Sequence, residues 1–424
     1  MQTEIHPNLK SLPAVTEAEA ILRSCVHCGF CTAVCPTYLE LGDDLDSPRG
    51  RIYLIKTILE EDTVSPDMNQ HLDRCLTCRS CETTCPSGVE YGRLLDISKD
   101  LIETRYKPKR PLLRQLKSAG LRVLLPRPRL FGAFYKLGLV FRPLLPAALK
   151  NKMPLSPVPQ LPKFEGARFQ GARFEEARFE GAKSQVHAPA KTALVLEGCV
   201  QRSLTPGVNR ATENLLARHD IGVRYLADEG CCGAVDYHLG QHQAGIQRAR
   251  QLIDKLYGEL DQVEWIISTA SGCGVMLKDY PVTLKDDPEY LRKAEQIAAK
   301  TRDISEVLAP LAFSCQPLNV AVHTPCTLQH GQQLPNVITE IIRAAGANLV
   351  PVAESHLCCG SAGTYSVLEQ ALADRLTTRK VACLTQHAPD VIVTANVGCQ
   401  TQLAAYADTP VMHWVEFLAH YSCD

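Results

Sequence analysis

Two runs of four cysteines near the N-terminus constrain this chain more than any other feature of its sequence. The first run consists of Cys25, Cys28, Cys31 and Cys35, and the second of Cys75, Cys78, Cys81 and Cys85. Every member of the second run follows its counterpart by 50 residues, and a proline ends each run. Chance rarely produces such agreement, so we interpret this part of the chain as an internal duplication whose thiols act together.

The 19 cysteines of this 424-residue chain are compatible with disulfides, zinc or iron-sulfur chemistry, depending on compartment and spacing. The first 20 residues carry acidic side chains where a secretory signal has a basic patch and then an apolar core. We therefore expect a cytoplasmic protein, in a reducing compartment where thiol-rich chains bind metal more often than they form disulfides. Lys and Arg total 45 against 46 Asp and Glu, which gives no general attraction to nucleic acid.

The spacing within each run is that of bacterial ferredoxins, in which the fourth cysteine of one run ligates the cluster of the other. This pattern predicts two [4Fe-4S] clusters. Cluster 1 is expected on Cys25, Cys28, Cys31 and Cys85, and cluster 2 on Cys75, Cys78, Cys81 and Cys35. The exchange of fourth ligands would tie the two halves of this region together.

Structural zinc is the main alternative, because paired Cys-x-x-Cys motifs also form tetrahedral sulfur sites. Two complete four-cysteine runs, ended by Pro36 and Pro86, favour iron-sulfur clusters over zinc. The choice decides the function, since cubane clusters transfer single electrons whereas zinc has no redox chemistry.

The segments between the two runs predict helices. The stretch SPRGRIYLIKTILEED has Ser47 as a plausible N-cap with Pro48 behind it, and MNQHLDRC predicts a further helix. We therefore expect residues 1–104 to form a mainly helical domain that carries the two clusters.

A second duplication fills the C-terminal half of the chain. Four cysteines (Cys199, Cys231, Cys232 and Cys273) are followed, after shifts of 127, 127, 127 and 126 residues, by Cys326, Cys358, Cys359 and Cys399. Apolar runs that end on a cysteine (ALVLEGC, NVAVHTPC, WIISTASGC and VIVTANVGC) predict buried strands, and GVNRATENLLARH and PNVITEIIRAAG predict helices. Alternating strands and helices indicate two α/β units with mainly parallel sheets, at residues 191–315 and 316–424. Ligands of such folds gather at the carboxyl ends of strands, where these cysteines fall.

The chain between the two duplications has a different composition. Residues 105–163 are rich in Lys, Arg and Pro and contain no Asp or Glu, so we expect basic connecting helices there. These helices either anchor the protein peripherally on a membrane, or pack over the ferredoxin-type domain or against a partner; binding of nucleic acid is a weaker alternative. Residues 164–190 repeat phenylalanine every five residues and are interpreted as a low-complexity linker. No apolar stretch reaches the length of a membrane span.

The motifs of both halves resemble a known family. EGC, GCCG and SGCG, then HTPC, LCCGSAGTY and NVGCQT look like the paired cysteine-rich (CCG) domains of heterodisulfide-reductase-type subunits. Together with SPRGRIYLIK, HLDRCLTC and GCCGAVDYHL, and the two ferredoxin runs, they resemble the glycolate oxidase (glycolate dehydrogenase) iron-sulfur subunits over nearly the full chain.

This resemblance implies an electron-transfer subunit of an oxidoreductase complex that acts on CH-OH donors, with no catalytic residue on this chain. FAD and the oxidation of glycolate, or of a similar 2-hydroxyacid such as D-lactate, are expected on partner subunits. The expected acceptor is a membrane quinone, reached from the cytoplasmic face of the inner membrane. The sequence contains no dinucleotide-binding loop, phosphate-binding loop or nucleophile motif, any of which would indicate an independent catalytic site.

The chain departs from the wider family at the end of each CCG repeat. Relatives with unusual clusters end each repeat in Cys-x-x-Cys, whereas this chain has Met276 and Gln402 at the last position. The four thiols of each repeat therefore leave three alternatives: a further iron-sulfur cluster, a structural core of free thiols, or a surface for subunit docking. For the whole chain, an anaerobic glycerol-3-phosphate dehydrogenase subunit, a heterodisulfide-reductase-like thiol-disulfide enzyme and a zinc-stabilised interaction module remain as alternatives.

Overall fold

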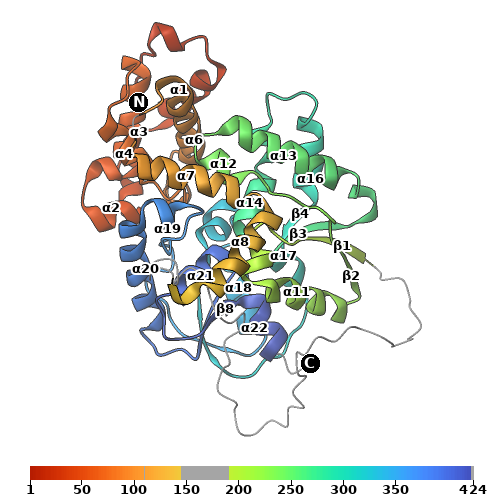
Figure 1. Ribbon diagram of the computed structural model, residues 1–424. Coiled ribbons are helices and arrows are strands. Elements are labelled where there is room, and N and C mark those ends of the chain that lie inside the picture. Colours follow the sequence, from red (N-terminus) through yellow and green to blue (C-terminus); the bar gives the residue numbers. More distant parts are fainter. Residues whose placement is uncertain (109, 145–190, 422–424) are drawn as a thin grey trace.

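The computed structural model describes residues 1–108, 110–144 and 191–421 of the chain. A helical N-terminal part, red to orange in Figure 1, sits on one end of two α/β units, which are green and blue. Helices α7 (Leu112–Leu124) and α8 (Pro128–Val140) lie across the region where the three parts meet. The linker predicted at residues 164–190 lies outside the described residues, as does the end of the basic segment.

The N-terminal part is helical, as the sequence predicts. Its helices are α1 (Pro13–Ser24), α2 (Pro36–Leu41), α3 (Pro48–Glu61), α4 (Pro66–Asp73), α5 (Ser80–Thr83) and α6 (Tyr91–Leu101), and a π-helical turn (Ile102–Tyr106) extends the last one. The predicted cap of α3 is confirmed, because the Ser47 hydroxyl accepts a hydrogen bond of 3.0 Å from the Gly50 N–H and Pro48 occupies the first turn. Fully buried side chains of α1, α3 and α6, including Leu22, Ile55 and Leu94, form the core of this part.

The first CCG repeat contains a four-stranded parallel sheet in the order β2-β1-β3-β4. Its strands are β1 (Lys191–Leu196), β2 (Ile221–Arg224), β3 (Trp265–Ser268) and β4 (Thr301–Asp303). The helices of this repeat are α10 (Gln201–Leu204), α11 (Pro206–Arg218), α12 (Ala234–His238), α13 (His242–Tyr257), α14 (Ser271–Lys278), α15 (Tyr280–Thr283), α16 (Leu291–Lys300) and α17 (Ile304–Leu308).

The second CCG repeat has the same topology, with a parallel sheet in the order β6-β5-β7-β8. Its strands are β5 (Asn319–Val322), β6 (Asn348–Leu349), β7 (Val391–Thr394) and β8 (Val411–His413). A π-helical turn (Thr327–Gly331) follows β5, and the helices are α18 (Val337–Ala344), α19 (Tyr365–Leu368), α20 (Gln370–Thr385), α21 (Val397–Ala404) and α22 (Trp414–Tyr421). The predicted fold class, a helical domain followed by two α/β repeats with parallel sheets, is confirmed.

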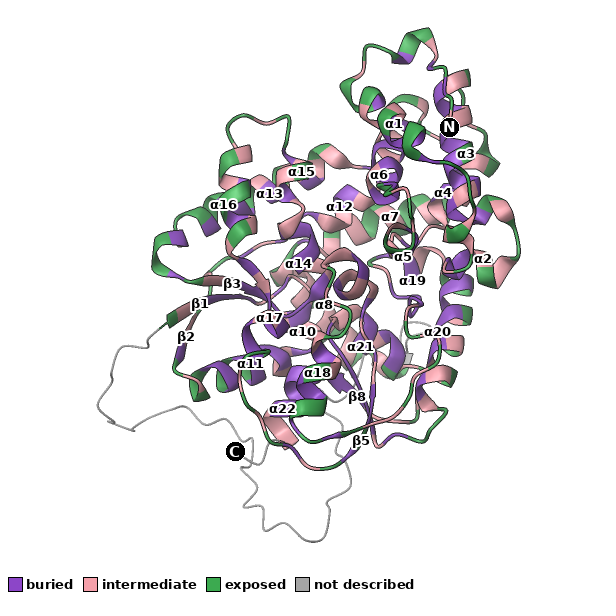
Figure 2. Ribbon diagram, turned by 180° about the vertical axis from the view of Figure 1, so that it is seen from behind, coloured by how far each residue is buried: buried purple, intermediate pink, exposed green. Residues whose placement is uncertain are grey.

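The two repeats share one apolar core. Val195 and Leu215 of the first repeat belong to the same buried cluster as Val393, Trp414 and Phe417 of the second. Figure 2 shows buried strands of both sheets, while the exposed positions lie on outer helix faces and loops. This shared core holds the carboxyl ends of β3 and β7 close together, and the Ser271 N–H donates across the junction to the Ala395 carbonyl at 3.3 Å.

Polar contacts dock the helical part on both repeats. Arg79 pairs with Asp279 of the first repeat at 2.6 Å, and the Tyr365 hydroxyl of the second repeat donates to the Arg74 carbonyl at 3.0 Å. Thr83 lies 2.8 Å from His330 Nδ1. The second cysteine run is therefore flanked by contacts to both repeats.

Within the described parts of the chain, no helix combines the length and the apolar character that crossing a bilayer requires.

Candidate metal centres

The loops of the two ferredoxin-type runs follow the same backbone path. His27 and Thr77 occupy equivalent positions and have positive φ angles of 59° and 51°, and Gly29 and Arg79 repeat the pattern with 86° and 60°. Left-handed backbone is uncommon for residues other than glycine, so its recurrence at matching positions is informative. The duplication read from the sequence is thus a duplication of local geometry.

The four thiols predicted for cluster 1 lie around one small cavity. It is lined by Cys25, Cys28, Cys31 and Cys85, with Cys81 also at its wall. Cys25 is buried and Cys28 is exposed, so this cavity lies close to the surface of the protein. The second run thus contributes Cys85 to the first loop, as the ferredoxin pattern predicts.

The thiols predicted for cluster 2 also lie together. Burial raises the pKa of Cys81 well above its ordinary value, and the neighbouring Cys78, Cys75 and Cys35 raise it further. Burial, with Cys326 of the second repeat next in effect, likewise raises the pKa of Cys78. The second thiol set therefore lies deeper than the first and adjoins a CCG repeat.

A buried guanidinium lies beside the second thiol set. Arg51 is 1% exposed, and it donates to Asp46 at 3.2 Å and to the Thr37 hydroxyl at 3.0 Å, which in turn lies 3.2 Å from Cys35 Sγ. Burial lowers the pKa of Arg51, but Cys75 and other negative neighbours outweigh it and hold the pKa above its ordinary value. A fixed positive charge of this kind stabilises anionic sulfur ligands. The sequence motif SPRGR contained this residue, but nothing in its pattern predicted the role.

The donor atoms of both sets suit a [4Fe-4S] cluster, which is held by four cysteine thiolates. Burial raises the pKa of Cys31 to about 11, and repulsion from Cys25, Cys28 and Cys35 adds to the shift. Crowded thiols of this kind ionise when a metal supplies the opposing positive charge. The residues present therefore fit the predicted clusters.

Each CCG repeat brings its four dispersed cysteines together. In the first repeat the thiols form a chain of neighbours from Cys199 through Cys231 and Cys232 to Cys273. In the second, Cys326 Sγ lies 3.9 Å from Cys358 Sγ, Cys358 adjoins Cys359, and Cys359 adjoins Cys399. The thiols of each repeat gather at strand ends, as the sequence suggests. Their role as cluster ligands stays a prediction.

The positions three residues after Cys273 and Cys399 hold side chains other than cysteine. Met276 is 2% exposed and packs in the apolar core of the first repeat. Gln402 is 1% exposed and donates to the Thr377 hydroxyl at 2.8 Å. Neither side chain replaces the missing thiolate, so each repeat offers four sulfur donors.

One histidine of the second repeat joins its thiols. Ligand atoms of His323, Cys359 and Cys399 all lie within 4.8 Å of one another. His323 Nδ1 lies 2.8 Å from the Thr394 hydroxyl, and burial together with Lys380 lowers the pKa of His323 to about 3, so the imidazole is neutral. The first repeat has Leu196 at the corresponding position. In the sequence His323 stands three residues before Cys326, and no recognised spacing motif marks it as a ligand.

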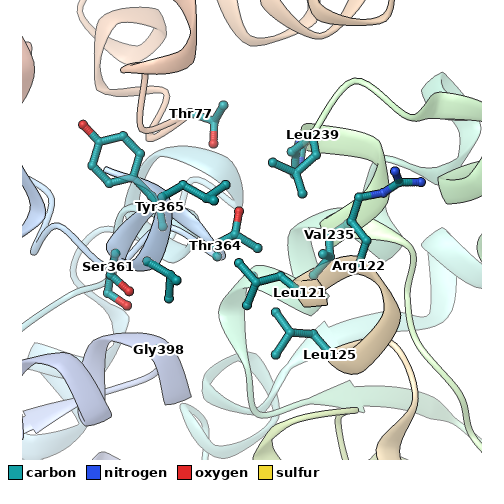
Figure 3. A pocket seen from close by; sticks show the side chains of 18 of the residues that line it. Thr77, Leu121, Arg122, Leu125, Val235, Leu239, Ser361, Thr364, Tyr365 and Gly398 are labelled. Carbon is teal, nitrogen blue, oxygen red and sulfur yellow. The ribbon is translucent and has the colours of Figure 1, made fainter. Parts of the chain in front are cut away.

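A large cavity lies where the helical part, α7, α8 and both repeats meet. It has a volume of about 1210 Å³. Its wall includes Cys78 of the second ferredoxin run, Cys199 and Cys273 of the first repeat, and Cys326 and Cys399 of the second. Figure 3 shows Leu121 and Leu125 on one side of this space and Thr364, Tyr365 and Ser361 on another. Three of the four thiol sets thus open onto one space.

Comparisons with known proteins agree with this arrangement. Residues 21–89 match the family described as 4Fe-4S dicluster domain, and residues 193–278 and 320–404 each match the family described as cysteine-rich domain. The chain is 44% identical over 423 residues to the glycolate oxidase iron-sulfur subunit of Escherichia coli (strain K12), a match that covers 99% of this chain and 98% of that protein. The chain belongs to the family of glycolate oxidase iron-sulfur subunits.

Other relatives extend the comparison. The probable glycolate oxidase iron-sulfur subunit of Bacillus subtilis (strain 168) is 32% identical over 409 residues, covering 91% of this chain and 89% of that protein. Lactate utilization protein A of Shouchella clausii (strain KSM-K16) is 24% identical over 208 residues, which is 47% of this chain and 85% of that protein. Membership of the glycolate oxidase iron-sulfur subunit family confirms the resemblance read from the motifs and makes this chain an iron-sulfur protein with an electron-transfer role. The assignment of each cysteine to one cluster stays a prediction.

Proposed function

We propose that this chain carries electrons from a partner subunit, where bound FAD oxidises glycolate or a similar 2-hydroxyacid such as D-lactate, to a quinone in the membrane. Two [4Fe-4S] clusters are assigned to this role, one on Cys25, Cys28, Cys31 and Cys85 and the other on Cys75, Cys78, Cys81 and Cys35. Such clusters, when bound, accept and release one electron at a time.

The observation that carries this proposal is the exchange of fourth cysteines between the two runs. Cys85 lies at the cavity of the first loop, and Cys35 lies among the thiols of the second. Two sets linked in this way are close neighbours, which is what stepwise transfer of single electrons needs. Cys28 of the first set is exposed, whereas Cys81 and Cys35 of the second set are buried and Cys75 and Cys78 are half-buried. The first set therefore lies nearer the surface, and the second lies deeper in the protein.

The protein's own side chains support this role. Arg51 supplies a buried positive charge at the second set, and Thr37 links it to Cys35. Charge and hydrogen bonding around the sulfurs set the reduction potential of an iron-sulfur centre. These residues therefore serve to position the ligands and tune them, while the substrate is oxidised on the partner.

We also assign a further iron-sulfur cluster to the CCG repeats. Its candidate ligands are the eight thiols of Cys199, Cys231, Cys232, Cys273, Cys326, Cys358, Cys359 and Cys399. The four sulfur donors gathered in each repeat support this assignment, and so does the position of Cys78 near Cys326. Such a centre would lie next to the second ferredoxin-type set.

The choice of substrate rests on the relatives. The two that span most of the chain are named for glycolate oxidase, and the shorter ones for lactate utilization. The protein would work at the cytoplasmic face of the inner membrane, bound peripherally, with FAD-binding glycolate oxidase subunits as its partners.

Anaerobic purification from cells that assemble iron-sulfur clusters tests this function. Iron and acid-labile sulfide analysis is expected to give about eight irons for the ferredoxin-type pair, and a larger number if the CCG repeats also bind a cluster. Co-purification is expected to recover a flavoprotein that reduces a dye with glycolate. Recovery of a flavoprotein active only on glycerol 3-phosphate would overturn the substrate assignment, and a colourless protein without iron would overturn the function itself.

A further inference from the structure

Helices α7 and α8 present an apolar outer face. Eight of the 17 large apolar side chains that are exposed in the described chain lie on these helices or on the residue after α8: Leu112, Leu113, Leu116, Val123, Phe134, Leu137, Val140 and Phe141. Leu112 and Val140, at the two ends of this stretch, are 71% and 73% exposed. An exposed apolar patch of this extent marks a surface that binds something.

The charge of the same helices indicates what binds there. Lys117, Arg127 and Lys136 are exposed among the apolar side chains, and no acidic residue occurs between Arg105 and Lys163. Interleaved basic and large apolar side chains are the pattern of helices that lie in the headgroup region of anionic membranes. The outer face of α7 and α8 therefore fits a lipid surface better than a second protein of mixed charge.

The inner face of the same two helices forms a wall of the large cavity. Leu121 and Leu125 point into the space in Figure 3, and Phe131 and Tyr135 of α8 also line it. Helices α7 and α8 thus carry the exposed apolar patch on their outer face and line the cavity with their inner face. The two are separated by the thickness of one helix.

The cavity is large enough to admit a small molecule. Small-molecule sites in proteins typically measure roughly 300–1,000 Å³, and this space measures about 1210 Å³. Near α7 and α8 the wall includes Leu121, Leu125 and Phe131, and also Arg114 and Arg122, which are paired with Glu369 and Asp236. The polar groups Ser361 and Thr364 belong to the loop that follows Cys359. Figure 3 shows these two side chains across the space from Leu121. The cavity can therefore hold an apolar molecule whose polar end faces hydroxyl groups close to the thiols.

We propose that this cavity binds the head group of an isoprenoid quinone, which reaches it from the membrane on which the outer face of α7 and α8 rests. This inference rests on the proposed function and adds the place of the acceptor. Reduction of one quinone to the quinol takes up two electrons, which derive from the hydroxyacid, and two protons from water. The tail of the quinone lies among the apolar side chains of α7 and α8, and the head lies towards Ser361 and Thr364.

Sedimentation with vesicles tests the outer face. The full chain is expected to bind vesicles of phosphatidylcholine with phosphatidylglycerol, and to bind less to phosphatidylcholine alone. The double variant Leu116→Glu and Leu137→Glu should weaken this binding about tenfold, whereas Val282→Glu, at an exposed apolar residue of the first repeat, should not. Unchanged vesicle binding in the double variant, with loss of the flavoprotein partner instead, would show that this face is a subunit interface and overturn the proposal.

Photolabelling tests the inner face without measuring turnover. A photoreactive short-chain quinone analogue, displaced by unlabelled short-chain quinone, is expected to label peptides of α7 and of the Ser361–Thr364 loop. Leu121→Trp fills the cavity and should reduce this labelling about tenfold. Val282→Trp adds the same ring at an exposed position of the first repeat, away from the cavity wall and from the outer face of α7 and α8, and should leave it unchanged. Equal labelling of both variants would overturn the proposal.

The two proposals fail in different ways. A wild-type complex that reduces dye with glycolate but shows no displaceable labelling would contradict the quinone site and leave the proposed function intact. A chain that shows displaceable labelling but contains no iron would contradict the proposed function and leave the cavity as a quinone site of another kind.

Discussion

The ferredoxin-type runs and the CCG repeats both gather four thiols, but they do so by different means. In the first, three ligands lie on one loop with two residues between each pair of neighbours, and left-handed residues such as His27 and Thr77 bend that loop. In the second, the four cysteines are spread over most of a repeat, and the ends of parallel strands bring them together.

The difference explains why the sequence predicts a specific set of ligands for one region and leaves the ligand role of the other open. Two complete four-cysteine runs with ferredoxin spacing favour a [4Fe-4S] cluster, so the ligands predicted for this region are specific. Strand ends can gather thiols around a cluster, around a single metal ion or around nothing.

The largest effect is expected from the crossing ligand. Cys85→Ala removes the one thiol of cluster 1 that comes from the other run, so the protein should lose about four irons per chain relative to the wild type. Iron analysis and EPR of the anaerobically purified protein measure the loss. Cys383→Ala removes a cysteine that belongs to neither kind of set and should keep the full iron content.

A second cysteine variant tests the CCG repeats. Cys232→Ala should preserve the EPR signals of the ferredoxin-type pair and remove only iron in excess of about eight per chain. If this variant lost the signals of the N-terminal pair, the two regions would not be independent sites, and the contrast would fail.

The next largest effect concerns the buried charge beside cluster 2. Arg51→Gln leaves Asp46 without a fully buried partner, and breaking a buried ion pair in this way costs about 3–5 kcal/mol. Urea unfolding of the anaerobic protein should show this loss in the free energy of unfolding. Arg23→Gln breaks an exposed pair with Glu19 and should cost under about 1 kcal/mol. Equal costs for the two variants would mean that Arg51 makes no special contribution.

The CCG region has a buried acid whose titration should appear in its stability. Burial raises the pKa of Glu416 to about 7 from 4.5, although the side chain accepts bonds from His413 N and Gln400 Nε2 at 3.1 Å. The folded state therefore keeps the proton longer than the unfolded state does. The free energy of unfolding should fall by about 3 kcal/mol as the pH rises from about 4.5 to about 7.

The variant Glu416→Gln carries no titratable group at this position, so this part of the pH dependence should disappear. Urea titrations of both proteins at a series of pH values provide the comparison. A wild-type curve and a variant curve that run parallel would contradict the raised pKa.

The smallest effect is expected at the cap of α3, the helix between the two runs. Ser47→Ala removes the side-chain acceptor for the Gly50 N–H and should cost about 1 kcal/mol without loss of iron. Thr378→Ala, at an exposed position of α20, should change the free energy of unfolding by less than about 0.5 kcal/mol. Loss of iron from Ser47→Ala would show that the helix cap, and not the loop alone, holds the cluster ligands.

The sequence predicted the features that depend on local patterns. Ser47 and Pro48 marked the start of α3, and the runs that end at Cys273 and Cys399 marked β3 and β7. The twofold repetition of cysteines predicted two sheets of equal topology, because a duplicated pattern folds twice in the same way.

Other features depend on contacts between distant segments and left no local pattern. Arg51 lies in an ordinary helical stretch, and its burial results from α2, the loop at Asp46 and α4 closing around it. The large cavity arises only when α7 and α8 lie over the junction of three separate parts. His323 lies near Cys359 and Cys399 because β5 and β7 are neighbours in the sheet. In the sequence both cysteines lie far downstream of His323.

The most direct test of the account is to mix the reconstituted complex with glycolate in the absence of oxygen and follow the EPR spectrum of rapidly frozen samples. We predict that signals of reduced [4Fe-4S] clusters appear in the wild-type complex, and that those of cluster 1 are missing when this chain carries Cys85→Ala. Reduction of the flavin while every cluster of this chain stays oxidised would contradict the account.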